Sequence, residues 1–147
     1  MIIKTEADVS RSNAERLAEK YSKVGKKSLT VGVHKKDNDT YPNGATTAEV
    51  GMWQEFGTVT LPPRIWLRIF NLMEAEKQDL RVQIELAFEN DDIDEALKEI
   101  GAYMADRIKD RIWSNEVKPD SHNKSGMTLL DTGRLVNSIN YEVKDVQ

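Results

Sequence analysis

Four acidic residues close together form the first group in this chain whose side chains could do chemistry. Asp91, Asp92, Asp94 and Glu95 could bind a hard cation and support hydrolysis or phosphoryl transfer. Their spacing matches no known cation-binding loop, and neither histidine is near them in the sequence. Acids also suit the start of a helix, with Asp92 as N-cap and Glu95 at the third helical position. The pattern favours this helix start over a metal-dependent hydrolase, which stays an alternative, and no metal is expected.

The two histidines, His34 and His122, are the candidates for general acid–base catalysis. A general base needs a positioned nucleophile or water and a partner that orients it, and the sequence supplies neither. The glycines match no phosphate-binding pattern of the Walker or dinucleotide type. Because the chain has no cysteine, thiolate metal sites and cysteine nucleophiles are excluded. The sequence therefore predicts a protein without a catalytic site or a cofactor.

Two lysine pairs form the candidate surface for DNA. Lys26 and Lys27 precede a predicted strand, and Lys35 and Lys36 follow it. A net charge of −4 provides no general field for neutralising phosphates, so solvated strand ends are the favoured interpretation. A DNA-binding accessory protein stays an alternative function.

Residues 55–68 are the most informative segment, and they contain no nucleophile and no metal-ligand pattern. Gly57 is predicted to end an aromatic helix, and Pro63 to occupy the first turn of the next one, directly after Pro62. The segment therefore predicts a structural corner that presents a surface.

The aromatic and basic side chains around this corner could lie in the core or in a protein interface. Trp53 and Phe56 occur at helical spacing and are predicted to be core residues. Tryptophan and arginine are enriched at interfaces, so Trp66, Arg64 and Arg68 are assigned to a subunit or partner interface with the two prolines. The two arginines are one helical turn apart and are expected to project from one face.

The elements that position these residues follow from periodicity and turn signals. A chain of 147 residues with 39% hydrophobic and 31% charged residues suits one domain, 1–147, with long half-exposed helices. Helices are predicted at 10–24, 46–56, 63–88, 93–112 and after 131, and strands at 1–4, 28–34 and 139–143. The first helix carries Ala14, Leu17, Ala18, Tyr21 and Val24 on one face. The spacing of Thr46 and Glu49 predicts a capping box at the start of the second helix. The helix at 93–112 is predicted to carry an apolar stripe of Ile93, Leu97, Ile100, Met104, Ile108 and Ile112.

Two long loops are predicted to connect these elements. Residues 35–45 and 114–127 are rich in turn formers and are predicted to be exposed, mobile loops. We expect an α+β fold, with a small antiparallel sheet packed against two long amphipathic helices. The N-terminus becomes polar too early for a signal peptide, and no apolar run reaches membrane-spanning length, so a soluble protein made in the cytoplasm is expected.

Two motifs in this order resemble the tail-completion proteins of long-tailed bacteriophages, which are head–tail joining (neck, minor tail or virion morphogenesis) proteins. The first is Glu-Phe-Gly-Thr at 55–58, followed by Leu-Pro-Pro-Arg at 61–64 and an aromatic residue at 66. The second is Leu-Asp-Thr-Gly-Arg-Leu at 130–135, followed by Ser138 and Ile139. The resemblance covers about residues 29–143.

The resemblance implies a structural virion protein in the neck of a tailed phage, assembled in the host cytoplasm and without enzymatic activity. It implies a homo-oligomeric ring, commonly a hexamer, that joins the connector or head-completion protein to the tail tube or tail terminator. DNA would pass through the lumen without specific binding. The two loops would order on neighbouring subunits, and His122, Lys124 and Arg134 are assigned to the same interface. The DNA-binding alternative then becomes an accessory protein of phage morphogenesis.

Overall fold

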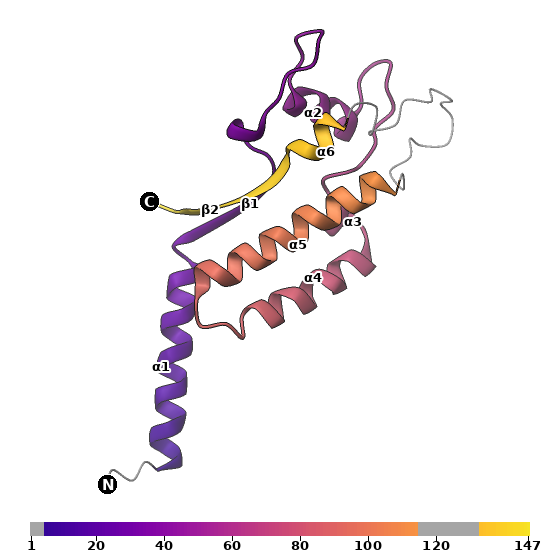
Figure 1. The fold of residues 1–147 in the computed structure, drawn as a ribbon. Helices are drawn as coiled ribbons and strands as arrows, with labels where there is room; N and C mark the ends of the chain where they lie inside the picture. Colours follow the sequence, from indigo (N-terminus) through magenta and orange to yellow (C-terminus); the bar gives the residue numbers. More distant parts are fainter. Residues whose placement is uncertain (1–4, 115–132) are drawn as a thin grey trace.

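A computed structural model describes residues 5–114 and 133–147. Within these residues the chain forms an α+β fold of six α-helices, a 3-10 helix and a two-stranded antiparallel sheet (Figure 1). This confirms the predicted fold class. The elements are α1 (Glu6–Val24), β1 (Lys27–Val33), η1 (Lys35–Asp37), α2 (Thr47–Phe56), α3 (Ile69–Leu72), α4 (Glu74–Ala87), α5 (Ile93–Trp113), α6 (Arg134–Ser138) and β2 (Ile139–Asp145). The strand predicted at 1–4 lies outside the described residues.

Helix α5 is the centre of the fold, between the sheet and α4 (Figure 1). Its start is as predicted, because the Asp92 carboxylate accepts hydrogen bonds from the backbone N–H groups of Asp94 and Glu95. The predicted apolar stripe is also confirmed, since five of its six members are buried and Met104 is half-buried: Ile93, Leu97, Ile100, Ile108 and Ile112.

The two strands pair along their whole length, from Lys27 opposite Asp145 to Val33 opposite Ile139. Their period of two places Leu29, Val31 and Val33 on the face that packs with the core around α5. The helix approaches the sheet closely at Gly101, where a Cβ atom would lie 2.7 Å from the Tyr141 ring. Glycine at this position therefore allows α5 to pack against the sheet.

The long helix predicted at 63–88 is wrong. Pro63 lies outside any helix, and the helical part is divided into α3 and α4 by Met73, whose backbone is extended at φ −108° and ψ 120°. The residues on the two sides of the break belong to different core clusters, Ile69 and Phe70 to one and Ala87 to the other. After the break, Arg107 of α5 donates to the buried Glu76 carboxylate at 3.0 and 2.7 Å, which attaches α4 to α5.

Helix α1 starts four residues earlier than predicted and projects from the body of the protein (Figure 1). Its predicted apolar face exists but is uncovered, with Leu17 50% and Tyr21 69% exposed. Contacts with the body occur near its C-terminal end, where the Lys20 ammonium donates to the carbonyl of Phe88 and lies 3.8 Å from the Asp91 carboxylate. Most of α1 is thus an exposed amphipathic helix.

Candidate partner interface

A buried carboxylate holds the corner at residues 55–68. Glu55 of α2 is 2% exposed. Its oxygens accept hydrogen bonds from the backbone N–H of Trp66 at 2.8 Å, the N–H of Leu67 at 2.9 Å and Nε of Arg68 at 2.6 Å. The Trp66 indole donates to the carbonyl of Gly51 at 2.8 Å. One acidic side chain therefore fixes the irregular segment where a helix was predicted to begin.

The prediction that Trp53 and Phe56 lie in the core is wrong, because they are 39% and 63% exposed. The inward face of α2 is formed instead by Thr47, Gly51 and Glu55, which are separated by four residues each. Gly51 faces the Trp66 ring, and a Cβ atom there would lie only 2.9 Å from it. The aromatic residues consequently point outward, with the Arg68 guanidinium 5.0 Å from the centre of the Phe56 ring.

The residues of the corner that were assigned to the interface differ in their burial. Arg64 and Trp66 are each 3% exposed, so in the single chain they are core residues. Burial lowers the pKa of the Arg64 guanidinium from its ordinary value. The expectation that Arg64 and Arg68 project from one helical face is wrong, because neither lies within a helix. Pro62 is half-buried, and Pro63 and Arg68 are exposed, so these three can still reach a neighbour.

The turn after α2 requires glycine. Gly57 has φ +76°, which L side chains rarely adopt, and a Cβ atom there would lie 2.8 Å from the carbonyl oxygen of Leu61. The Thr58 N–H donates to the same carbonyl at 2.8 Å and closes a tight loop. Val59 is fully exposed on this loop. Together, Met52, Trp53, Phe56, Val59 and Ile65 form an exposed apolar set on α2 and the following segment, which we call the corner surface.

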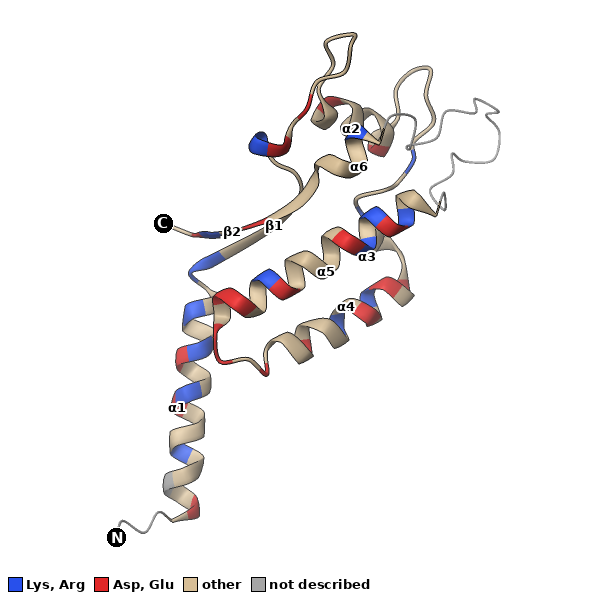
Figure 2. Ribbon diagram, viewed as in Figure 1, with Lys and Arg blue, Asp and Glu red and all other residues tan. Residues whose placement is uncertain are grey.

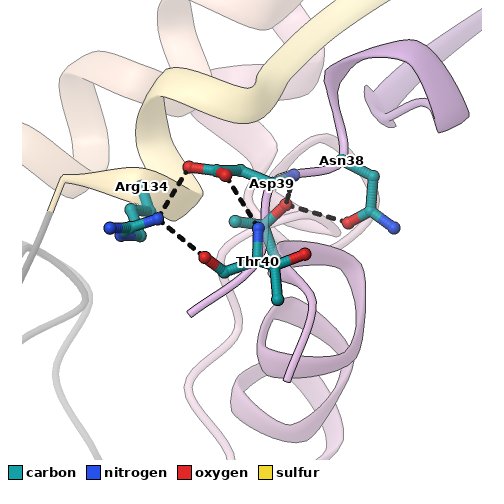
Figure 3. A network of polar contacts seen from close by, with 5 residues as sticks. Asn38, Asp39, Thr40 and Arg134 are labelled. Atoms are coloured by element: carbon teal, nitrogen blue, oxygen red, sulfur yellow. Dashed lines mark hydrogen bonds and ion pairs between the residues drawn. The ribbon is translucent and has the colours of Figure 1, made fainter. Parts of the chain in front are cut away.

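Arg134 attaches the loop at 35–45 to α6. Its guanidinium donates to the Asp39 carboxylate at 3.0 Å and to the carbonyl of Thr40 at 2.7 Å, as Figure 3 shows. It also lies 5.8 Å from the centre of the Tyr41 ring. The same loop is joined to α2, because Asn38 Oδ1 accepts from the hydroxyl of Thr47 at 3.0 Å. In the single chain, Arg134 therefore binds its own loop, and any contact with a neighbour stays a prediction.

We expect Arg134→Ala to loosen this loop while the rest of the protein stays folded. The Arg134 side chain is partly exposed, so the loss of its charge-assisted hydrogen bonds should lower the free energy of unfolding by only about 1 kcal/mol. Hydrogen exchange should accelerate at the N–H groups of Tyr41 and Thr47, which donate to Ala45 and Asp39. Arg134→Lys is the matched control and should show a smaller acceleration. Unchanged exchange in Arg134→Ala would contradict this role.

The predicted capping box of α2 is confirmed and gives the loop a fixed end. The Thr46 hydroxyl accepts from the Glu49 N–H, and the Glu49 carboxylate accepts from the Thr46 N–H at 2.8 Å. The hydrogen bonds that the Thr46 N–H and hydroxyl donate to the carboxylate lower the pKa of Glu49. An isolated bridge between Thr40 and Thr46 closes the loop, and η1 forms its start. The loop is thus hydrogen-bonded at both ends, and its mobility stays a prediction.

The acidic cluster and the lysine pairs contact groups within the chain. Asp94 lies 2.9 Å from Lys27, and Asp91 lies 3.8 Å from both Arg16 and Lys20. Lys27 also contacts the carboxylate of Asp145 at 2.7 Å, and the hydrogen bonds that its ammonium donates to Asp145 and Asp94 raise the pKa of Lys27. Figure 2 shows these opposite charges where α1, β1 and the start of α5 meet. These ion pairs attach α1 and β1 to the start of α5.

Lys36 and His34 also contact groups within the chain. Lys36 lies 3.4 Å from the Glu142 carboxylate on β2. His34 Nε2 lies 2.9 Å from the Thr30 hydroxyl, and its Nδ1 is 4.0 Å from the Asp37 carboxylate. His122 and Lys124 lie outside the described residues. No group of three or more potential metal ligands occurs among residues 5–114 and 133–147.

The structure reveals residues of the corner that sequence reasoning missed. Glu55 and Gly51 make its key contacts, and Asp39 binds Arg134 in the loop at 35–45. An acid between two aromatic residues of a short helix resembles an exposed side chain. The available signal was the four-residue spacing of Thr47, Gly51 and Glu55, a small and polar face opposite the aromatic one. That spacing alone gives no indication of which face is buried.

Comparisons of the chain with protein-family models, with curated proteins and with solved structures gave no match. None of the helices in the described part has the length and apolar character needed to cross a membrane.

Proposed function

We propose that this chain is a structural virion protein of a tailed phage. It forms a homo-oligomeric ring at the head–tail joint, as a neck or tail-completion protein, and joins the connector to the tail. The observation that carries this proposal is the corner surface, where Phe56, Trp53 and Val59 are exposed although they are large and apolar. Exposed apolar sets of this kind mark sites of protein–protein contact.

The arrangement of the two resembling motifs supports the same proposal. The segment 55–68 and the segment from Gly133 to Ile139 are far apart in sequence, but Trp66, Leu135 and Ile139 belong to one core cluster. A Cβ atom at Gly51 of α2 would lie 3.1 Å from the Leu135 side chain, so α2 and α6 pack closely. The described parts of the two motifs thus pack into one core cluster next to the corner surface.

The surface has the composition of an interface anchor. Aromatic side chains and methionine are enriched at the centres of interfaces, and Arg68 adds a charged group above the Phe56 ring. If this surface contacts a different surface of the next copy, the contact is heterologous and can close into a ring. Assembly then buries the aromatic residues that the single chain leaves exposed.

Electron microscopy of the purified protein tests the proposal, first alone at high concentration and then with heads and tails of the phage that encodes it. We expect rings in at least one of these conditions. Phe56→Ser should abolish them, because it removes an exposed anchor that is not part of the buried core. Leu86→Ser changes a large apolar side chain of α4 that is 54% exposed, against 63% for Phe56; it is the matched control and should leave rings intact.

Two outcomes would refute this assignment. The first is a protein that forms no ring alone and binds neither heads nor tails. The second is ring formation by Phe56→Ser at wild-type concentration, which would remove the corner surface from the interface. Circular dichroism of both variants checks that a loss of rings is not caused by unfolding.

A further inference from the structure

The uncovered face of α1, which we call the seam, has the spacing of a heptad repeat. It consists of six residues separated alternately by three and four positions: Ala7, Ser10, Ala14, Leu17, Tyr21 and Val24. A stripe of this kind is the narrow seam of a helix that packs against one other helix. All but Val24 are exposed, so no helix within residues 5–114 and 133–147 covers this face.

We infer that this helix is α1 of a second copy, packed antiparallel about a two-fold axis. The first argument is size. In the antiparallel register centred between residues 15 and 16, Ala14 faces Leu17, Ser10 faces Tyr21 and Ala7 faces Val24 of the other copy. Every small residue of the N-terminal half then meets a large residue of the C-terminal half, so the two surfaces interdigitate. A parallel pair would instead place small residues opposite small ones and leave gaps.

The second argument is charge. Residues 6–15 contain three acids and one base, a net charge of −2, whereas residues 16–24 contain three bases and one acid, a net charge of +2. Antiparallel pairing places the acidic half of each helix beside the basic half of the other, and parallel pairing places like charges together. Size and charge therefore both favour an antiparallel contact with α1 of a second copy.

The projecting position of α1 permits this contact. Lys20 and Arg16 point toward Asp91 on the body, on one flank of the helix, and Leu17 and Tyr21 stay exposed. A helix of 19 residues is about 28 Å long, so one pair of helices makes an interface well below the standard size. We therefore expect a weak dimer, with a dissociation constant on the order of tens of micromolar or more.

Sedimentation equilibrium of the full chain up to millimolar concentration tests the association. Leu17→Glu places a charge in the seam and should weaken dimerisation at least about 30-fold, as expected for a central anchor. Ser12→Glu adds the same charge on the opposite face of α1 and is the matched control. A wild-type protein that stays monomeric throughout overturns the inference, and so does a Leu17→Glu variant that associates like the wild type.

The orientation can be tested by disulfide trapping, because the natural chain has no cysteine. In the antiparallel pair, Ser10→Cys of one copy faces Tyr21→Cys of the other, and the two Ser10 positions are about 16 Å apart. A mixture of the two variants should cross-link under oxidation, whereas Ser10→Cys alone should not, since the distance exceeds what a disulfide can span. Efficient self-cross-linking of Ser10→Cys would show a parallel pair and overturn the inference.

This pairing does not depend on the proposed function. Rings that form without the corner surface leave the α1 pair intact, and a protein that makes no ring can still dimerise through α1. The Leu17→Glu and Phe56→Ser variants therefore separate the two hypotheses.

Discussion

Glu55→Ala is expected to reduce the free energy of unfolding by about 3–5 kcal/mol, the loss typical of removing one partner of a buried charged contact. The substitution leaves the N–H groups of Trp66 and Leu67 without their acceptor and removes the 2.6 Å contact of Arg68. Because Glu55 is almost completely buried, water cannot easily replace these hydrogen bonds. Urea unfolding monitored by tryptophan fluorescence measures the loss.

Two further variants show whether the hydrogen bonds or the packing cause that loss. Glu55→Gln has nearly the same shape but offers one acceptor oxygen and an amide group, so its effect should be intermediate. Glu85→Ala removes an exposed acid of α4 and should change the stability by less than about 0.5 kcal/mol. If Glu55→Ala were as mild as Glu85→Ala, the carboxylate would not be what holds the corner.

Gly101→Ala is expected to destabilise the protein by about 1–3 kcal/mol through overpacking. Alanine forms helices better than glycine by about 1 kcal/mol, so an isolated helix would gain from this change. In the folded protein the new Cβ atom would lie 2.7 Å from the Tyr141 ring and 2.8 Å from the Leu29 side chain. The helix and the sheet would have to separate, and thermal unfolding should report a lower Tm.

A double-mutant cycle identifies the cause of the Gly101 effect. With Tyr141→Ala already present, the ring that meets the new methyl group is absent and only the Leu29 side chain remains close, so Gly101→Ala should cost clearly less stability than in the wild type. Equal losses in the two backgrounds would mean that the close approach of α5 and β2 is not the reason for glycine at this position.

Local signals of the sequence predicted much of this structure correctly. The N-cap at Asp92, the capping box at Thr46 and Glu49, and the stripe of α5 are all present. Each depends on residues within one or two helical turns, so the sequence contains all the information that it requires. The same is true of the glycine that ends α2 and of the alternation within each strand, whereas the pairing of the two strands joins residues far apart in the sequence.

The direction in which an amphipathic element faces could not be predicted in this way. In α2 the aromatic side was expected in the core, but the small and polar side is buried because Trp66 fills the space above Gly51. Likewise, Arg64 looked like an exposed anchor and is buried. These outcomes depend on a segment more than ten residues away, which no helical period describes.

The sequence by itself determined the α+β class, the central helix α5 and the caps, because these arise from short-range spacing and hydrogen bonding. Only the tertiary structure decided that the helix after the corner breaks at Met73, that Glu55 fixes the corner and that α1 stands away from the body. The physical reason is that burial is a property of pairs of surfaces. A sequence specifies each surface, and the packed chain determines which surfaces meet and which are left exposed.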